Sequence, residues 1–238
     1  MCGIVGYTGV QSALDVVLAQ LDEVGGPEHD VCGVAVLADG GLACPPGADS
    51  LAALRAGLRQ RPLPAAGSGI GLRRRAGEPA ESGPQLDEAG RVAVVLVGEP
   101  SNRAELAAEL TGRGHELRTG AAGEVVARLL AEAFSSAFEP AEAARQLCRA
   151  LRGDFAFLAL LADAPDTVVA ARRGVPLTVA LGAGEAQLAS ERAALAAQPA
   201  GELLPLGDTP GEQVVLLRRE WDEVRCEVTD AEGSVLHA

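Results

Sequence analysis

MCGIVGYTG, residues 1–9, places a thiol directly after the first methionine and follows it with an apolar run typical of a β-strand. Removal of Met1 would leave Cys2 with a free α-amine next to its thiol. An α-amine has a pKa of about 8, so near neutral pH it is able to take a proton from a thiol a few bonds away. Cys2 is therefore a candidate nucleophile that needs no histidine. The alternative is a small apolar residue buried at the start of a strand.

The residues after this strand change to a helical pattern. In SALDVVLAQLDEV, residues 12–24, apolar side chains recur every three and four residues. A buried strand is predicted at residues 31–38 and a short helix at residues 49–60. Residues 61–90 are rich in glycine, proline and charge, which predicts a mobile or substrate-facing loop, with a plain linker as the alternative.

The rest of the chain divides into a helical middle and a strand-rich end. Residues 91–98 predict one more strand. Helices are expected at residues 101–114, 123–138 and 140–153. Short apolar runs separated by turns follow at residues 154–162, 166–173, 176–182, 186–190, 212–219 and 224–230. Strands, then helices, then strands, without strict alternation, favour an α+β fold built in layers over a doubly wound parallel sheet.

Composition narrows the possible partners and the compartment. The formal net charge of −13 opposes non-specific binding to nucleic acid or to an anionic membrane, so small molecules or proteins are the expected partners. The chain has 5 cysteines without a CxxC pair and 3 histidines, which argues against a disulfide framework, a metal site or another bound cofactor. With no apolar run of about 18 residues and no signal peptide pattern, we expect a cytoplasmic protein.

Several collinear motifs resemble the class II glutamine amidotransferase domain, and within it the glutaminase half of glucosamine-6-phosphate synthase. They are MCGIVGYTG, CGVAVL, RVAVV, NRAELAAELTGRGHELRTG, EVVARLL, LRGDFAFLAL, VVAARRGVPLTVALG and QLAS. The resemblance implies an N-terminal-nucleophile hydrolase fold, a four-layer αββα arrangement of two stacked sheets between helices. It spans nearly the whole chain, so residues 1–238 are expected to form a single domain of this kind, without a synthase domain.

The same resemblance implies roles for particular residues. In the family, the processed cysteine attacks the side-chain amide of glutamine, its α-amine acts as base, and ammonia leaves from a thioester intermediate; Cys2 holds that position. Arg74 corresponds to the arginine that binds the glutamine carboxylate, and a slip of one residue would exchange it with Arg73 or Arg75. The alternative for these arginines is a solvated loop. Gly98 corresponds to the glycine whose backbone N–H contributes to the oxyanion hole.

Other family positions differ in this chain. The oxyanion motif His-Asn-Gly is Leu-Val-Gly here, so Val97 replaces the amide donor. The aspartate that holds the glutamine α-ammonium is Ala122. Asp30 remains from a segment whose arginine is missing, and we expect Asp30, His29 and Glu124 to be structural or surface residues. The nucleophile end matches the family, whereas the recognition end does not.

Two readings follow from these matches and losses. The first is an amidotransferase-like or amidohydrolase-like enzyme that uses Cys2 on an amide or related acyl substrate, with altered or weak glutamine recognition. Its ligand would be a small amide or carboxylate. The second is an inactive relative that binds a metabolite or regulates a partner. A third, weaker possibility is an amide-transferring subunit completed by a partner synthase.

Overall fold

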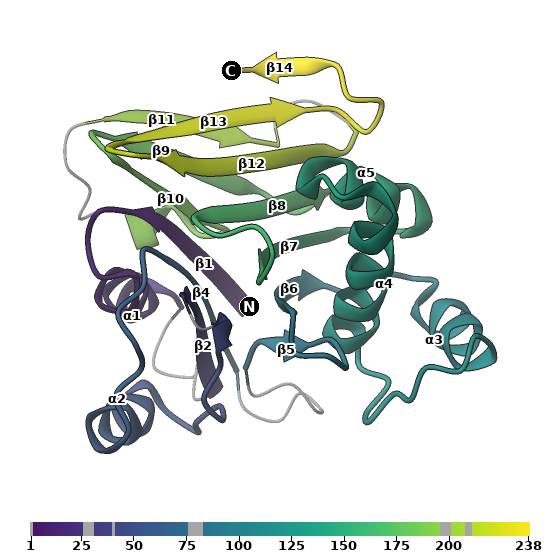
Figure 1. Ribbon diagram of the computed structural model, residues 1–238, viewed down its shortest axis with the longest axis horizontal. Coiled ribbons are helices and arrows are strands. Elements are labelled where there is room, and N and C mark those ends of the chain that lie inside the picture. Colours follow the sequence, from purple (N-terminus) through teal and green to yellow (C-terminus); the bar gives the residue numbers. More distant parts are fainter. Residues whose placement is uncertain (1, 26–30, 40, 76–82, 196–200, 208–210) are drawn as a thin grey trace.

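The structure is a computed structural model and describes residues 2–25, 31–39, 41–75, 83–195, 201–207 and 211–238. Two antiparallel sheets are stacked face to face, with helices on the outer face of each (Figure 1). This is the predicted αββα arrangement, so the α+β prediction is confirmed. Among the described residues, no helix is both long and apolar enough to cross a membrane.

The first sheet has β1 at its centre. Its strands, in spatial order, are β11 (Glu202–Leu206), β9 (Leu177–Gly182), β10 (Glu185–Ala189), β1 (Cys2–Gly9), β4 (Ser68–Arg74), β2 (Val31–Ala38) and β3 (Gly41–Ala43). β1 is paired with β4 from Cys2 to Thr8 and with β10 from Val5 to Gly9, so its backbone is held by a neighbouring strand along its whole length.

The second sheet is formed mainly by the C-terminal half of the chain. Its strands, in spatial order, are β14 (Val235–His237), β13 (Glu223–Thr229), β12 (Gln213–Glu220), β8 (Thr167–Arg173), β7 (Phe155–Leu161), β6 (Val92–Gly98) and β5 (Gln85–Leu86). The long strands predicted from apolar runs at residues 91–98, 154–162, 166–173 and 212–219 are confirmed here.

Helices cover the outer face of each sheet. The first sheet is covered by α1 (Ala13–Glu23), α2 (Leu51–Gln60) and the 3₁₀ turn η1 (Arg192–Leu195). The second is covered by α3 (Arg103–Gly112), α4 (Ala122–Ala137) and α5 (Pro140–Ala150). Ser12 and Ser50 begin α1 and α2 by accepting backbone N–H groups of the first turn, which satisfies donors that a helix leaves open.

The core follows the strand period of two. Ile4 packs between the sheets and Val5 packs under the helices of the first sheet, and both are fully buried. Ile70 of β4 and Leu158 of β7 belong to the same layer between the sheets as Ile4. Among the described residues this layer contains no aromatic side chain, and it is built mainly from branched aliphatic residues and alanine packed at close range.

The loop prediction for residues 61–90 is wrong for Ser68–Arg74, which form β4 between β1 and β2. Two glycines hide the strand pattern. A Cβ on Gly71 would lie 2.7 Å from Val17 Cγ1, and one on Gly69 would lie 3.2 Å from Ala13 Cβ. These positions therefore lack side chains because α1 packs directly on β4, and the segment reads as a turn although it is a central strand.

Candidate active site

Cys2 and Arg74 are brought together by strand pairing. Their Cα atoms are partners in the antiparallel β1–β4 ladder, and Gly3 is paired with Arg73 in the next position. β1 also contacts β6 of the other sheet, and Figure 1 shows the amino-terminal end of β1 next to β6. The strands that carry Cys2, Arg74 and Gly98 therefore meet at the interface between the sheets.

The three neighbouring arginines lie in different surroundings. The Arg73 guanidinium donates to the carbonyl oxygens of Leu21 (2.8 Å) and Val24 (3.2 Å), so it binds the last turn of α1. Strand alternation places Arg74 on the opposite face of β4, toward the second sheet, where it is buried with 8 % exposure. Arg75 follows the end of the strand and is exposed. Of the three, Arg74 has the position that fits a group held between the sheets.

Gly98 ends β6 in a conformation that requires glycine. Its φ is +83°, and a Cβ there would lie 2.4 Å from the Asp154 carbonyl oxygen. Val97, one residue earlier, packs partly buried against the core between the sheets. The backbone thus keeps a glycine at the predicted oxyanion position, and the residue before it offers an apolar side chain on the face toward the first sheet.

The predicted recognition residue Ala122 lies at the start of α4 and carries no charge. Ala122 is the first residue of α4 and packs partly buried against the outer core of the second sheet. His29 and Asp30 lie outside the described residues. The resemblance to the family expects Ala122 at a substrate contact, and the structure shows a small apolar side chain at a helix N-terminus, packed against the outer core of the second sheet.

Glu124 is a structural residue, as predicted. Its carboxylate is 1 % exposed and accepts the backbone N–H groups of Arg118 (2.7 Å), Thr119 (2.8 Å) and Gly120 (3.0 Å). Burial of the carboxylate works against ionisation, but these hydrogen bonds and one from the Thr119 hydroxyl outweigh it, so the pKa of Glu124 lies below its ordinary value. The ionised carboxylate fixes the loop that leads into α4.

Glu124→Gln is expected to lower the free energy of unfolding at pH 7 by about 3 kcal/mol, because an amide turns a donor toward backbone N–H groups. The folded pKa lies below the unfolded value of about 4.3, so the contribution of the carboxylate is complete above that pH and is lost as the pH falls through the folded pKa. Urea denaturation across pH should therefore show the difference between the two proteins shrinking below about pH 4. The exposed Glu109→Gln on α3 is the control, and a difference that stays constant down to acid pH would contradict the assignment.

The other cysteines are poor nucleophiles where they stand. Burial raises the pKa of Cys32 and Cys44 to about 11. Burial also raises the pKa of Cys226 to about 11 and that of Cys148 to about 12. These four thiols stay protonated at neutral pH and make no thiolate for attack.

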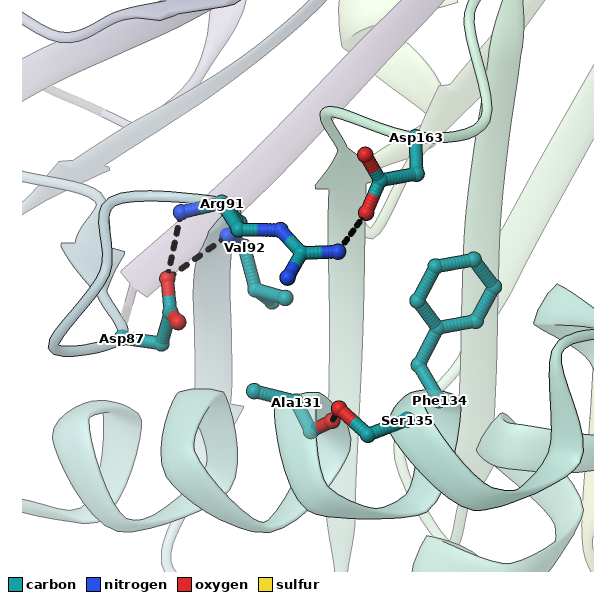
Figure 2. Close-up of a pocket in the computed structure, with 7 residues that line it drawn as sticks. All are labelled: Asp87, Arg91, Val92, Ala131, Phe134, Ser135 and Asp163. Carbon is teal, nitrogen blue, oxygen red and sulfur yellow. Dashed lines mark hydrogen bonds and ion pairs between the residues drawn. The ribbon is translucent and has the colours of Figure 1, made fainter.

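Sequence reasoning missed two cavities along α4. The smaller, of about 30 Å³, lies between α4 and the β5–β6 turn (Figure 2). In it Asp87 accepts the backbone N–H groups of Arg91 (2.6 Å) and Val92 (2.8 Å), and Arg91 forms an ion pair with Asp163. A larger cavity of about 400 Å³ adjoins it, lined in part by Arg128 and Glu132. The contacts in Figure 2 stabilise the turn, and we assign them a structural role.

Comparison with known proteins identifies the family of the chain. A sequence model described as "Glutamine amidotransferase domain" matches residues 74–197. A glutamine–fructose-6-phosphate aminotransferase [isomerizing] of Streptomyces coelicolor is 51 % identical over 238 residues, which covers 98 % of this chain and 37 % of that protein. Its counterpart in Thermus thermophilus is 36 % identical over 242 residues, again 98 % and 37 %. The chain thus spans little more than a third of the length of these relatives.

Solved structures show the same fold. The glutamine phosphoribosylpyrophosphate amidotransferase of B. subtilis matches with a TM-score of 0.76 at 18 % identity, over 95 % of this chain and 49 % of that one. A glutamine aminotransferase class-II domain protein of Silicibacter pomeroyi matches with a TM-score of 0.60 at 16 % identity, over 96 % and 99 % of the two chains. The predicted fold is confirmed, and the chain belongs to the class II glutamine amidotransferase domain family, close to the glutaminase domain of glutamine–fructose-6-phosphate aminotransferases.

Proposed function

We propose that the chain is an amidotransferase-like domain that binds glutamine weakly. In it Cys2, after removal of Met1, attacks an amide or related acyl substrate. The observation that carries the proposal is the β1–β4 register, which pairs Cys2 with the buried Arg74 on central strands of the first sheet. Position 2 also has the same parity in β1 as Ile4, whose side chain lies between the sheets.

The proposed reaction uses groups near the start of β1. The α-amine of Cys2 takes the thiol proton, and the thiolate attacks the amide carbon. The carbonyl oxygen gains negative charge, and the N–H of Gly98 is the proposed donor to it. The C–N bond then breaks, the leaving nitrogen takes the proton from the α-amine, and ammonia departs. Water hydrolyses the resulting thioester and restores the thiol.

Substrate choice in this proposal follows from what the site retains. Arg74 would bind the anionic end of the substrate, since a guanidinium pairs with a carboxylate through two parallel hydrogen bonds. Ala122 has no charge for an α-ammonium group, and Val97 has no amide for the oxyanion. The favoured substrate is therefore an amide with a carboxylate and without an α-amine, and glutamine is a poor one.

A second candidate function rests on the same two substitutions. The apolar Val97 and the neutral Ala122 equally suit a domain that has lost turnover and acts by binding a metabolite or a partner synthase. In this reading, Arg74 still binds a carboxylate. The two candidates differ in one property, which is whether Cys2 turns over an amide substrate.

Covalent labelling distinguishes these functions. Intact mass should show a protein without Met1, and iodoacetamide or a glutamine-like diazoketone should add to wild type but not to Cys2→Ala. Cys44→Ala is the matched control and should still be labelled, because burial keeps the Cys44 thiol protonated. Retention of Met1, or equal labelling of wild type and Cys2→Ala, would overturn the enzymatic proposal. Labelling at Cys2 without ammonia release from any tested amide would favour the binding function.

A further inference from the structure

The tip of the β12–β13 hairpin carries the most exposed large apolar side chain among the described residues. Trp221 is 92 % exposed and is the only tryptophan in the sequence. Glu220 and Glu223 are paired, so the turn consists of Trp221 and Asp222 alone. Nothing in the folding of this hairpin calls for an indole at its tip.

The backbone at this tip is unfavourable for tryptophan. Trp221 has a φ of +61° at the first central position of a two-residue turn, where glycine is the preferred residue. Bulky residues rarely adopt this conformation, and such residues cluster at functional sites. A large aromatic group is thus held in solvent at a conformational cost that glycine would remove.

A depression adjoins the indole. It has a volume of about 620 Å³ and is lined by Asp166, Arg219, Trp221 and Asp222, which we call the hairpin-tip site. The Arg219 guanidinium donates to Asp166 Oδ1 through Nη2 (2.6 Å) and Nε (3.2 Å), so these two charges offset each other. Asp222 is exposed and leaves the hairpin-tip site with a net negative charge.

This combination of an aromatic face and carboxylates selects for cations. An indole is the best side chain for cation–π contact, and nearby carboxylates add electrostatic attraction. The chain as a whole has a formal charge of −13, which draws basic partners toward it. Val10, 61 % exposed, lies against Gly184 together with the Asp222 backbone, so an apolar surface continues beyond the hairpin-tip site.

We propose that the hairpin-tip site docks a partner polypeptide by holding one of its arginine or lysine side chains against the Trp221 indole, next to Asp166 and Asp222. Tryptophan and arginine dominate the binding energy of protein interfaces, and the apolar Val10 extends the contact area beyond a single side chain. The Asp166 carbonyl oxygen accepts the hydroxyl of Thr8, six residues along β1 from Cys2, or about 20 Å. A partner at this end leaves the Cys2 end uncovered, so the inference stands apart from the proposed function.

The single tryptophan allows a direct test. Indole fluorescence of the full chain is titrated with a peptide of alternating glycine and arginine, a matched glycine–glutamate peptide, methylguanidinium and maltose. We expect a saturable change with the arginine peptide, a much weaker response to methylguanidinium, and none with the other two. Equal affinity for methylguanidinium would overturn docking in favour of a small-molecule site. A response to maltose but not to the arginine peptide would overturn the choice of a cation.

Calorimetric titration of variants distinguishes binding at the hairpin-tip site from non-specific attraction of the basic peptide to the acidic chain. Trp221→Gly is expected to weaken binding of the arginine peptide by roughly tenfold, and Asp222→Asn by about threefold. Phe138→Ala is the matched control, since Phe138 is also aromatic, 82 % exposed and at positive φ (57°), and it should leave affinity unchanged. Trp221→Gly should keep or raise the denaturation temperature, which excludes unfolding as the cause. Unchanged affinity in Trp221→Gly would overturn the proposal.

Discussion

Ammonia release from glutamine is expected to rise by about a hundredfold or more when Val97 is replaced by Asn and Ala122 by Asp in the same chain. Resemblance to the family assigns the first position to an amide that stabilises the oxyanion and the second to a carboxylate that binds the α-ammonium. An oxyanion donor acts on the transition state and should raise kcat. A carboxylate that binds the ground state should lower KM.

Both substitutions are compatible with the fold. Val97 is only partly buried and lies one residue before the end of β6, so an amide there keeps access to solvent or to ligand. Ala122 is the first residue of α4, where the helix N-terminus favours a negative charge. The expected change in activity should therefore appear without loss of the folded state.

Controls make this gain specific. Cys2→Ala added to the double variant should abolish the new activity. Ala104→Asp is charge-matched and, like Ala122, lies in the first turn of a helix; its side chain on α3 is exposed, so it should leave the rate unchanged. A folded double variant with the rate of wild type would show that Val97 and Ala122 do not line the substrate site, and would favour the binding function.

The layers were predictable from sequence, whereas β4 was not. The long strands of the second sheet are continuous apolar runs, which is how strands covered on both faces appear. In β4, Gly69 and Gly71 occupy the alternate positions because α1 packs against them, so half of the apolar pattern is missing. Contact of this kind between a helix and a sheet involves residues far apart in sequence, so a local sequence pattern does not predict it.

The same omission left the arginine cluster ambiguous. If Arg73, Arg74 and Arg75 lay in a loop, the sequence would not show which of them faces the site. In a strand, neighbouring side chains point to opposite faces of the sheet. The register of β4 directs Arg73 to the end of α1 and leaves Arg74 for the interface between the sheets. Trp221 was also missed, since its exposure and positive φ exist only once the β12–β13 hairpin is formed.

Gly98→Ala is expected to destabilise the fold by about 3 kcal/mol, measured as a lower urea midpoint with an unchanged slope. The new Cβ would lie 2.4 Å from the Asp154 carbonyl oxygen and 3.1 Å from Phe155 Cα; Phe155 is the β7 partner of Gly98, and Asp154 directly precedes it. Backbone atoms cannot move aside as a flexible side chain does, so β6 or β7 must shift. A loss below about 1 kcal/mol would mean that this strand end adapts easily.

Gly90→Ala separates backbone conformation from contact. Gly90 also has a positive φ, +67°, but its Cβ would meet nothing within 4 Å, so we expect a cost of only about 1 kcal/mol. The excess at Gly98 then measures the contact with Asp154. If Gly98→Ala costs more stability than Gly90→Ala, the β6–β7 pairing itself requires glycine at position 98. Glycine would then be expected there in an active and in an inactive domain alike. The presence of Gly98 is consequently weak evidence for catalysis. The gain in activity expected from Val97→Asn is the stronger test of whether this site is catalytic.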